Sequence, residues 1–135
     1  MIELYSDIVA LYNKVHMIHI RTVNMWCTAT LHPLLWIHYS ILQDMVDRFW
    51  EDIIQKGLKK DVPTTLECLK KTTISENMMY DEKQEIVDDL YKDYEYLRDD
   101  IKQKTNKEKD LLIQNILIDF WDTATKLVAD LSREY

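Results

Sequence analysis

Apolar residues recur at helical spacing along the first part of the chain. Residues 3–20 form a predicted helix whose apolar side chains share one face: Leu4, Ile8, Leu11, Val15 and Ile18. A short polar stretch from Thr22 to Thr30 separates it from a second helix, with Pro33 in its first turn and Gly57 after its end. The stripe of this second helix is Leu31, Leu35, His38, Leu42, Met45, Phe49 and Ile53. The pattern predicts two amphipathic helices joined by a short connection.

The rest of the chain predicts two more long helices, over residues 79–104 and 107–133, with a break at Thr105 and Asn106. Their inward residues are Val87, Leu90, Tyr94, Leu97 and Ile101, and then Ile113, Leu117, Phe120, Ala124, Leu127 and Leu131. The segment between the second and third helices holds a loop and a short helix near 63–71. We therefore predict an all-α four-helix bundle, a single domain over residues 1–135, in which this middle connection crosses the bundle.

Composition supports a helical protein that handles cations. One glycine and two prolines among 135 residues favour long helices, and the net charge of −7 argues against a dedicated nucleic-acid binder. No apolar run approaches the roughly 18–20 residues of a membrane span, and we expect no signal peptide and a cytoplasmic location. Cys27 and Cys68 lack metal-type spacing and are expected to be free thiols.

The outer face of the second helix carries two tryptophans. At 100° per residue, seven side chains lie nearly opposite the apolar stripe: His32, Trp36, Gln43, Asp47, Trp50, Glu51 and Ile54. Large apolar groups there would be exposed in a monomer, so we expect this face to be buried against another subunit. Scattered surface aromatics are the alternative interpretation.

The same face carries candidate metal ligands. Asp47 and Glu51 are four residues apart and are neighbours on one helical turn, and carboxylates with imidazoles suit Fe(II). His32 precedes Asp47 by 15 residues, which places it roughly 22 Å away. Two antiparallel copies of this helix, related by a two-fold axis, would bring His32 of one chain to the carboxylates of the other. His19 ends the first helix and can approach His32 across the short connection.

The other histidines are interpreted as structural. His38 lies on the core stripe, and His16 has no partner that the sequence identifies. The predicted site therefore takes His19 and His32 from one chain and Asp47 and Glu51 from its mate.

This pattern resembles the Dps-type mini-ferritins of the ferritin-like superfamily. Leu31-His32 is similar to the family's Leu-His, and Asp47 and Glu51 follow His32 at the family's fifteen and nineteen residues. Further similarities are Gly57 after the second helix, the short crossover helix and its exit at 62–67 and 74–76, Asp110 near the start of the last helix, and Trp121. The resemblance covers nearly the whole chain.

The chain also departs from the family. His19 and His32 are thirteen residues apart, where the family usually has twelve. Ile20 replaces the tryptophan that usually follows the first histidine, and Trp36 stands where many members carry an acidic iron ligand. The site is therefore expected either to hold one iron tightly and the other weakly, or to be impaired. The Glu-x-x-His pairs of the longer ferritins do not occur.

The resemblance implies a twelve-subunit cage that oxidises Fe(II), typically with hydrogen peroxide, stores ferric mineral and protects against oxidative stress. In that ferroxidase-type enzyme His19 and His32 would be nitrogen donors and Asp47 and Glu51 oxygen donors. Trp36 and Trp50 would pack beside the site and exclude water. Asp110 is a candidate pore residue, or else a carboxylate that the start of a helix favours.

Three further expectations concern partners and alternatives. Members that coat DNA use a lysine-rich tail, whereas this chain ends Ser132-Arg133-Glu134-Tyr135, so we expect weak or no DNA binding. One alternative function is a Dps-like cage with impaired ferroxidase activity in a structural or signalling role. The other is a helical-bundle interaction module unrelated to ferritins.

Overall fold

The computed structural model describes residues 1–25, 29–54, 62–76 and 79–135, and this part of the chain contains helices and no strand. The long helices are α1 (Ile2–Arg21), α2 (Leu31–Phe49), α5 (Lys83–Lys107) and α6 (Leu111–Ser132). Three short elements accompany them: the 3-10 turn η1 (Thr22–Asn24), the π-helical turn η2 (Trp50–Ile54) and α4 (Thr65–Lys71). The prediction of an all-α chain is confirmed. None of the described helices is long and apolar enough to cross a membrane.

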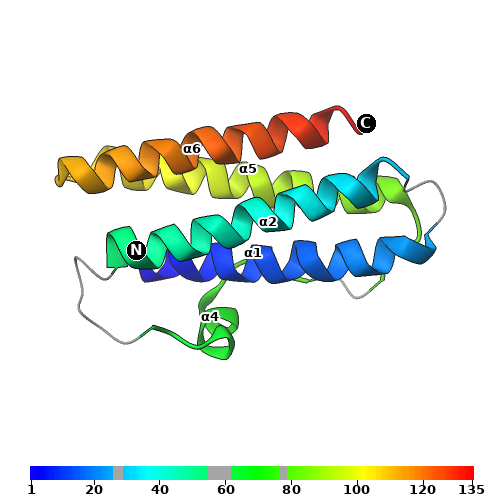
Figure 1. Ribbon diagram of the computed structural model, residues 1–135, viewed down its shortest axis with the longest axis horizontal. Coiled ribbons are helices and arrows are strands. Elements are labelled where there is room, and N and C mark those ends of the chain that lie inside the picture. The colour runs from blue at the N-terminus through cyan, green and yellow to red at the C-terminus, as the bar shows by residue number, and fades with distance from the viewer. Residues whose placement is uncertain (26–28, 55–61, 77–78) are drawn as a thin grey trace.

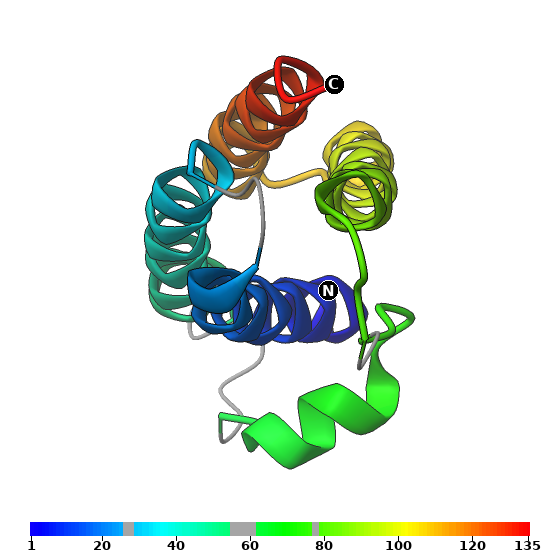
Figure 2. The ribbon, with the colours of Figure 1, turned by 90° about the vertical axis from the view of Figure 1, so that its right-hand side faces the viewer.

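The four long helices pack side by side as a bundle. Seen from one end, α1, α2, α6 and α5 follow one another around the core, and α4 lies outside the bundle against α1 (Figure 2). α1 and α2 run in opposite directions, as do α5 and α6, whereas α2 and α5 run in the same direction (Figure 1). The connection from α2 to α5 therefore crosses the length of the bundle, as the sequence predicts.

The core follows the predicted apolar stripes closely. Every stripe residue predicted in α1, α2 and α5, and the η2 residue Ile53, is buried. In α6 the only difference is Ile113, which is half-buried in the first turn. The rings of Phe49 and Phe120 stack with centroids 6.0 Å apart and join α2 to α6. Burial of these stripes is the main apolar driving force for the bundle.

The boundaries of the third and fourth helices differ from the prediction, and α6 begins at Leu111 rather than at residue 107. Thr105 and Asn106 do not break the third helix, because α5 continues to Lys107. The Thr105 hydroxyl donates to the Ile101 carbonyl at 2.8 Å, one turn back, which lets a buried threonine remain within the helix. α5 also begins at Lys83 rather than at residue 79. Gly57 and Cys27 lie outside the described residues, and Cys68 is a buried free thiol on α4.

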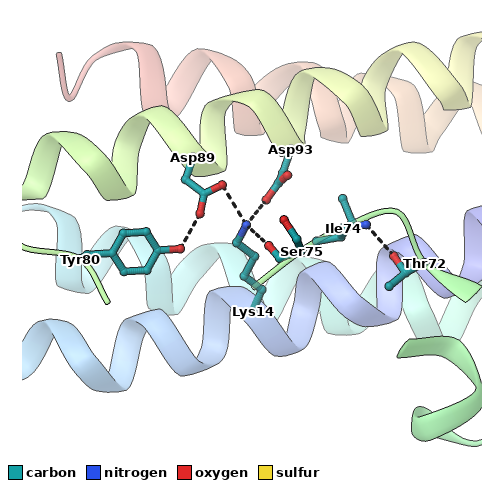
Figure 3. Close-up of polar contacts among 7 residues, drawn as sticks. All are labelled: Lys14, Thr72, Ile74, Ser75, Tyr80, Asp89 and Asp93. Atoms are coloured by element: carbon teal, nitrogen blue, oxygen red, sulfur yellow. Dashed lines mark hydrogen bonds and ion pairs between the residues drawn. The ribbon is translucent and has the colours of Figure 1, made fainter. Parts of the chain in front are cut away.

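A buried lysine ties the crossing segment to the bundle. The Lys14 side chain of α1 is 1% exposed, and its Nζ donates to Asp89 (3.0 Å), Asp93 (2.6 Å) and the Ser75 carbonyl (2.6 Å) (Figure 3). Tyr80 donates its phenolic proton to the second oxygen of Asp89 at 2.5 Å. The three ammonium protons thus reach three acceptors, the arrangement that a buried cation requires.

Asp7 holds the start of the same segment. One oxygen of this buried carboxylate accepts from the Thr72 hydroxyl at 2.5 Å and from the Thr73 backbone N–H at 3.1 Å. Asp7 and Lys14 therefore fix the path of residues 72–75 along α1, which sets where α5 can begin.

We expect Lys14→Met to destabilise the fold strongly. The substitution keeps a side chain of similar length but leaves Asp89 and Asp93 without their cation. We expect the free energy of unfolding to fall by about 3 kcal/mol. This is near the lower end for a broken buried ion pair, because both carboxylates are partly exposed. Urea unfolding measures this loss, and Lys126→Met, at an exposed site on α6, is the control. Equal unfolding midpoints for the two variants would contradict the role assigned to Lys14.

Candidate metal centre

The structure brings His19 and His32 together at one end of the bundle. His19 lies in the last turn of α1 and His32 in the first turn of α2, on either side of the connection that reverses the chain. Their imidazole rings stack with centroids 4.0 Å apart and an interplanar angle of 18°. Both side chains are half-buried, so the pair remains open to solvent.

The hydrogen bond of His19 determines which ring nitrogen holds its proton. His19 Nδ1 lies 3.0 Å from the His32 carbonyl oxygen, which can only accept. In the neutral ring Nδ1 therefore carries the proton, and Nε2, across the ring, carries the lone pair. This assignment follows from the partner rather than from observed hydrogens.

Thr22 gives His32 the same tautomer. The Thr22 hydroxyl donates to the His19 carbonyl at 2.7 Å, so its lone pairs face the His32 Nδ1 atom, 2.8 Å away. His32 Nδ1 then donates its proton to Thr22, and Nε2 is left as the acceptor. Metal-binding histidines commonly donate one ring N–H to a fixed oxygen in this way, which orients the other nitrogen as a ligand.

The environment of His19 favours its neutral form. Burial lowers the pKa of His19, and the nearby imidazoles of His32 and His16 lower it further, against the hydrogen bond to the His32 carbonyl, which raises it. A neutral imidazole is the form that binds a metal ion.

His16 has aromatic partners that the sequence interpretation missed. Its ring lies 4.6 Å from that of Tyr39 and stacks on Tyr12 at 6.0 Å, and Tyr39 also contacts His19 at 5.3 Å. The expectation that His16 has no partner is therefore wrong. Helical spacing could have found this cluster, since His16 is one turn before His19 and Tyr39 is two turns after His32.

The predicted carboxylates lie apart from this histidine pair within one chain. Asp47 and Glu51 are both exposed near the other end of α2, and Glu51 belongs to the π-helical turn η2. Across the described residues, no three His, Cys, Asp or Glu side chains gather closely enough to hold a metal ion. The two imidazoles of one chain would therefore need oxygen donors from elsewhere, as the sequence geometry anticipates.

The two tryptophans occupy different environments. Trp36 is 57% exposed, and with Ile37, Ser40, Ile41 and Asp44 it lines a surface hollow on α2. Trp50 is half-buried and packs on Tyr5 of α1, with ring centroids 6.3 Å apart. The prediction that Trp50 belongs to the exposed outer face is therefore wrong, because α1 covers this flank of α2.

Tyr5 lies close to the carboxylate end of α2. Burial raises the pKa of Tyr5, and the charges of Cys68 and Asp47 add to this effect. Trp50 thus accompanies the carboxylate half of the predicted site, whereas Trp36 lies one turn from the imidazole half. In the described part of the chain no aromatic contact joins either tryptophan to His19 or His32.

Asp110 serves as the N-cap of α6. Its Oδ1 accepts the backbone N–H groups of Leu112 (2.9 Å) and Ile113 (3.2 Å). This capping satisfies two of the free N–H groups at the helix start and accounts for a carboxylate here. Its candidate role in a pore stays a prediction. Trp121 is half-buried beside the core.

No protein-family model, curated protein or solved structure matches this chain. The resemblance to mini-ferritins therefore rests on the sequence alone, and the histidine pair is the structural feature that bears on function.

The hydrogen bonds predict the protonated nitrogen on each ring. In nitrogen-15 NMR spectra near neutral pH we expect both His19 and His32 to carry their proton on Nδ1. Thr22→Val removes the hydroxyl that selects this form in His32, so His32 should shift toward a mixture of tautomers while His19 stays unchanged. Thr123→Val is the control, because that hydroxyl donates to a helix carbonyl away from the pair. A proton on Nε2 of either wild-type ring would contradict the assignment.

Proposed function

We propose that this chain is the subunit of a ferritin-like, Dps-type cage that oxidises Fe(II) at sites shared by two subunits and stores the ferric product. The observation that carries the proposal is the stacked pair of His19 and His32, with both Nδ1 protons donated to fixed oxygens and both Nε2 lone pairs left available. A purely structural imidazole pair would not need both rings in the same tautomer.

The donor set suits iron as a substrate. Imidazole nitrogens and carboxylate oxygens together accommodate Fe(II), an ion of intermediate softness that accepts both. In this proposal His19 and His32 bind the ion through nitrogen, and Asp47 and Glu51 of the neighbouring subunit offset its charge. Each Fe(II) gives one electron, and hydrogen peroxide accepts two with two protons to form water. The net charge of −7 favours the arrival of cations at the particle.

Two features of the chain support the proposed ferritin-like cage. The large apolar side chains exposed on α1 and α2 include Ile20 (50%), Trp36 (57%) and Ile37 (49%), and burying them against a second subunit would remove apolar surface from water. The crossing connection between the parallel helices α2 and α5 is also the topology that ferritin-like bundles use.

Trp36 favours one alternative, a cage with impaired ferroxidase activity. It lies one turn after His32, where an acidic residue would supply another oxygen donor, and its side chain is largely exposed. Such a cage would bind a single Fe(II) per site and oxidise it slowly. A monomeric particle would instead favour a helical interaction module.

The first test is the mass of the native particle, measured by light scattering on a sizing column before and after Fe(II) and hydrogen peroxide are added. We expect a particle of about twelve subunits, the closed assembly that the resemblance to mini-ferritins implies, which turns amber and stays soluble. An intact cage that oxidises Fe(II) no faster than buffer would support the impaired alternative. A monomer or dimer without oxidation would rule out the proposal.

Mixed particles test whether two chains share the site. His32→Ala and Asp47→Ala should each abolish the iron oxidation of the pure particle. The two variants are then unfolded, mixed in equal amounts and assembled together. About half of the two-fold pairs then contain one chain of each variant, and one of the two sites in such a pair is intact. The mixture should therefore recover about a quarter of the wild-type activity. No recovery, with intact assembly, would place all the ligands in one chain.

The control mixture combines His19→Ala with His32→Ala. Both changes remove ligands from the same half of the site, so no pairing of these chains rebuilds an intact site. Recovery in this mixture would contradict the assignment of both histidines to one chain.

A further inference from the structure

A second set of polar side chains lies inside the bundle. His38 on α2, Tyr94 on α5 and Asp130 on α6 form a hydrogen-bonded row across three helices. His38 Nδ1 lies 3.1 Å from the Tyr94 hydroxyl, and His38 Nε2 lies 3.1 Å from the Asp130 carboxylate. His38 and Tyr94 are both 0% exposed, whereas the side chain of Asp130 is 18% exposed.

The positions of the protons in this row follow from what each group can do. The Asp130 carboxylate can only accept, so His38 Nε2 carries a proton and donates it. Burial lowers the pKa of His38, against the raising effect of Asp130, and the ring is neutral at pH 7. Nδ1 then has a lone pair and accepts the proton of the Tyr94 hydroxyl. The Tyr94 hydroxyl therefore donates its proton to the neutral imidazole of His38, which in turn donates to the Asp130 carboxylate.

Such a row can move a proton but cannot reach a dissolved substrate. In hydrolases an Asp–His pair takes a proton from a hydroxyl, and the carboxylate stabilises the imidazolium that forms. Here the hydroxyl is completely buried, so no acyl or phosphoryl group can approach it. An electron, in contrast, can leave a buried ring without contact between the ring and the oxidant.

We propose that Tyr94 is a redox-active tyrosine whose oxidation is coupled to proton transfer to His38. Tyr94 loses one electron to a one-electron oxidant of the kind that peroxide and iron generate, and its phenolic O–H bond breaks. The proton moves to His38 Nδ1 and forms a new N–H bond. The products are a neutral tyrosyl radical, an imidazolium on His38 and the reduced oxidant.

The charges inside the bundle favour this step. Before oxidation the row holds one negative charge, on Asp130, beside a neutral imidazole and a neutral phenol. After oxidation the imidazolium faces the Asp130 carboxylate, so the new positive charge is paired where it forms. Asp130 also faces Arg133 at 3.7 Å near the surface, which connects the row to solvent.

Tyr94 hydrogen-bonds an imidazole through its hydroxyl, whereas Tyr12 and Tyr39 contact His16 through their rings. Tyr80 also donates to a carboxylate, but Lys14 already binds that Asp89, which makes it a poorer proton acceptor. Tyr91 is half-buried and contacts Tyr135 through its ring, without an imidazole. His38, the partner of Tyr94, follows His32 by six residues, a rise of roughly 9 Å along α2. The inference goes beyond iron oxidation, because any strong oxidant at that end of the bundle would serve.

The test uses the full chain without iron, so its result is independent of the proposed iron site. A laser flash oxidises a ruthenium polypyridyl complex in the presence of a sacrificial electron acceptor, and electron paramagnetic resonance of rapidly frozen samples detects the radicals left on the protein. Tyrosine deuterated on the ring identifies a tyrosyl radical by its narrower signal. We expect a tyrosyl signal in the wild type that Tyr94→Phe removes and Tyr91→Phe retains.

Asp130→Asn tests the role of the carboxylate, and Tyr80→Phe tests whether the radical forms on another buried tyrosine. Asp130→Asn removes the carboxylate that stabilises the imidazolium, and we expect the radical yield to fall by about tenfold, the factor that corresponds to one charge-assisted hydrogen bond. Circular dichroism establishes that each variant is folded. The absence of a tyrosyl signal in the wild type, an unchanged signal in folded Tyr94→Phe, or its loss in Tyr80→Phe would overturn the proposal. An unchanged radical yield in Asp130→Asn would contradict the role assigned to the Asp130 carboxylate.

Discussion

The burial of Lys14 is the constraint on which the arrangement of the helices depends. A desolvated ammonium group is stable only where acceptors surround it, and here these come from the crossing segment and from two turns of α5. Apolar packing alone would accept several rotations of α5 against α1, since one buried aliphatic side chain can replace another at modest cost. The cation selects one of them, because any other position of Asp89 and Asp93 leaves a charge unpaired. The path of the crossing segment and the parallel direction of α2 and α5 are consistent with this selection.

The histidine pair depends on a different constraint, the tight reversal between α1 and α2. A helix ends with free carbonyl groups, and a connection this short brings those of α1 beside the first turn of α2. The His19 carbonyl accepts from Thr22, and the His32 carbonyl accepts from His19 itself. The backbone therefore determines which nitrogen of His19 is free, and the Thr22 hydroxyl, held by the His19 carbonyl, does the same for His32. A site built in this way keeps its orientation as long as the helix ends remain in place.

The sequence predicts the core well because burial leaves a periodic pattern, and each stripe from Leu4 to Ile101 lies where the period places it. It predicts the histidine pair because two helices joined by a short connection must bring their adjoining ends together. The sequence does not predict the partners of Lys14 or His16. Those contacts depend on how each helix is turned about its own axis relative to its neighbours, and the apolar periodicity does not determine this orientation finely enough. The prediction for Trp50 is wrong for the same reason, since the position of α1 decides whether that side of α2 is covered. Thr105 shows a further limit, because a buried hydroxyl that bonds to its own helix removes the cost expected of a polar residue there.

The contrast between the histidines shows how partners rather than residue type decide the chemistry. His38 has both ring nitrogens engaged inside the bundle, one with Tyr94 and one with Asp130, so it has no lone pair to offer a metal ion. His19 and His32 each have Nδ1 engaged with an oxygen, which leaves one lone pair on each ring at a half-buried surface. The first arrangement can only pass a proton between neighbours, whereas the second can bind a cation. The bundle places these two kinds six residues apart on one helix.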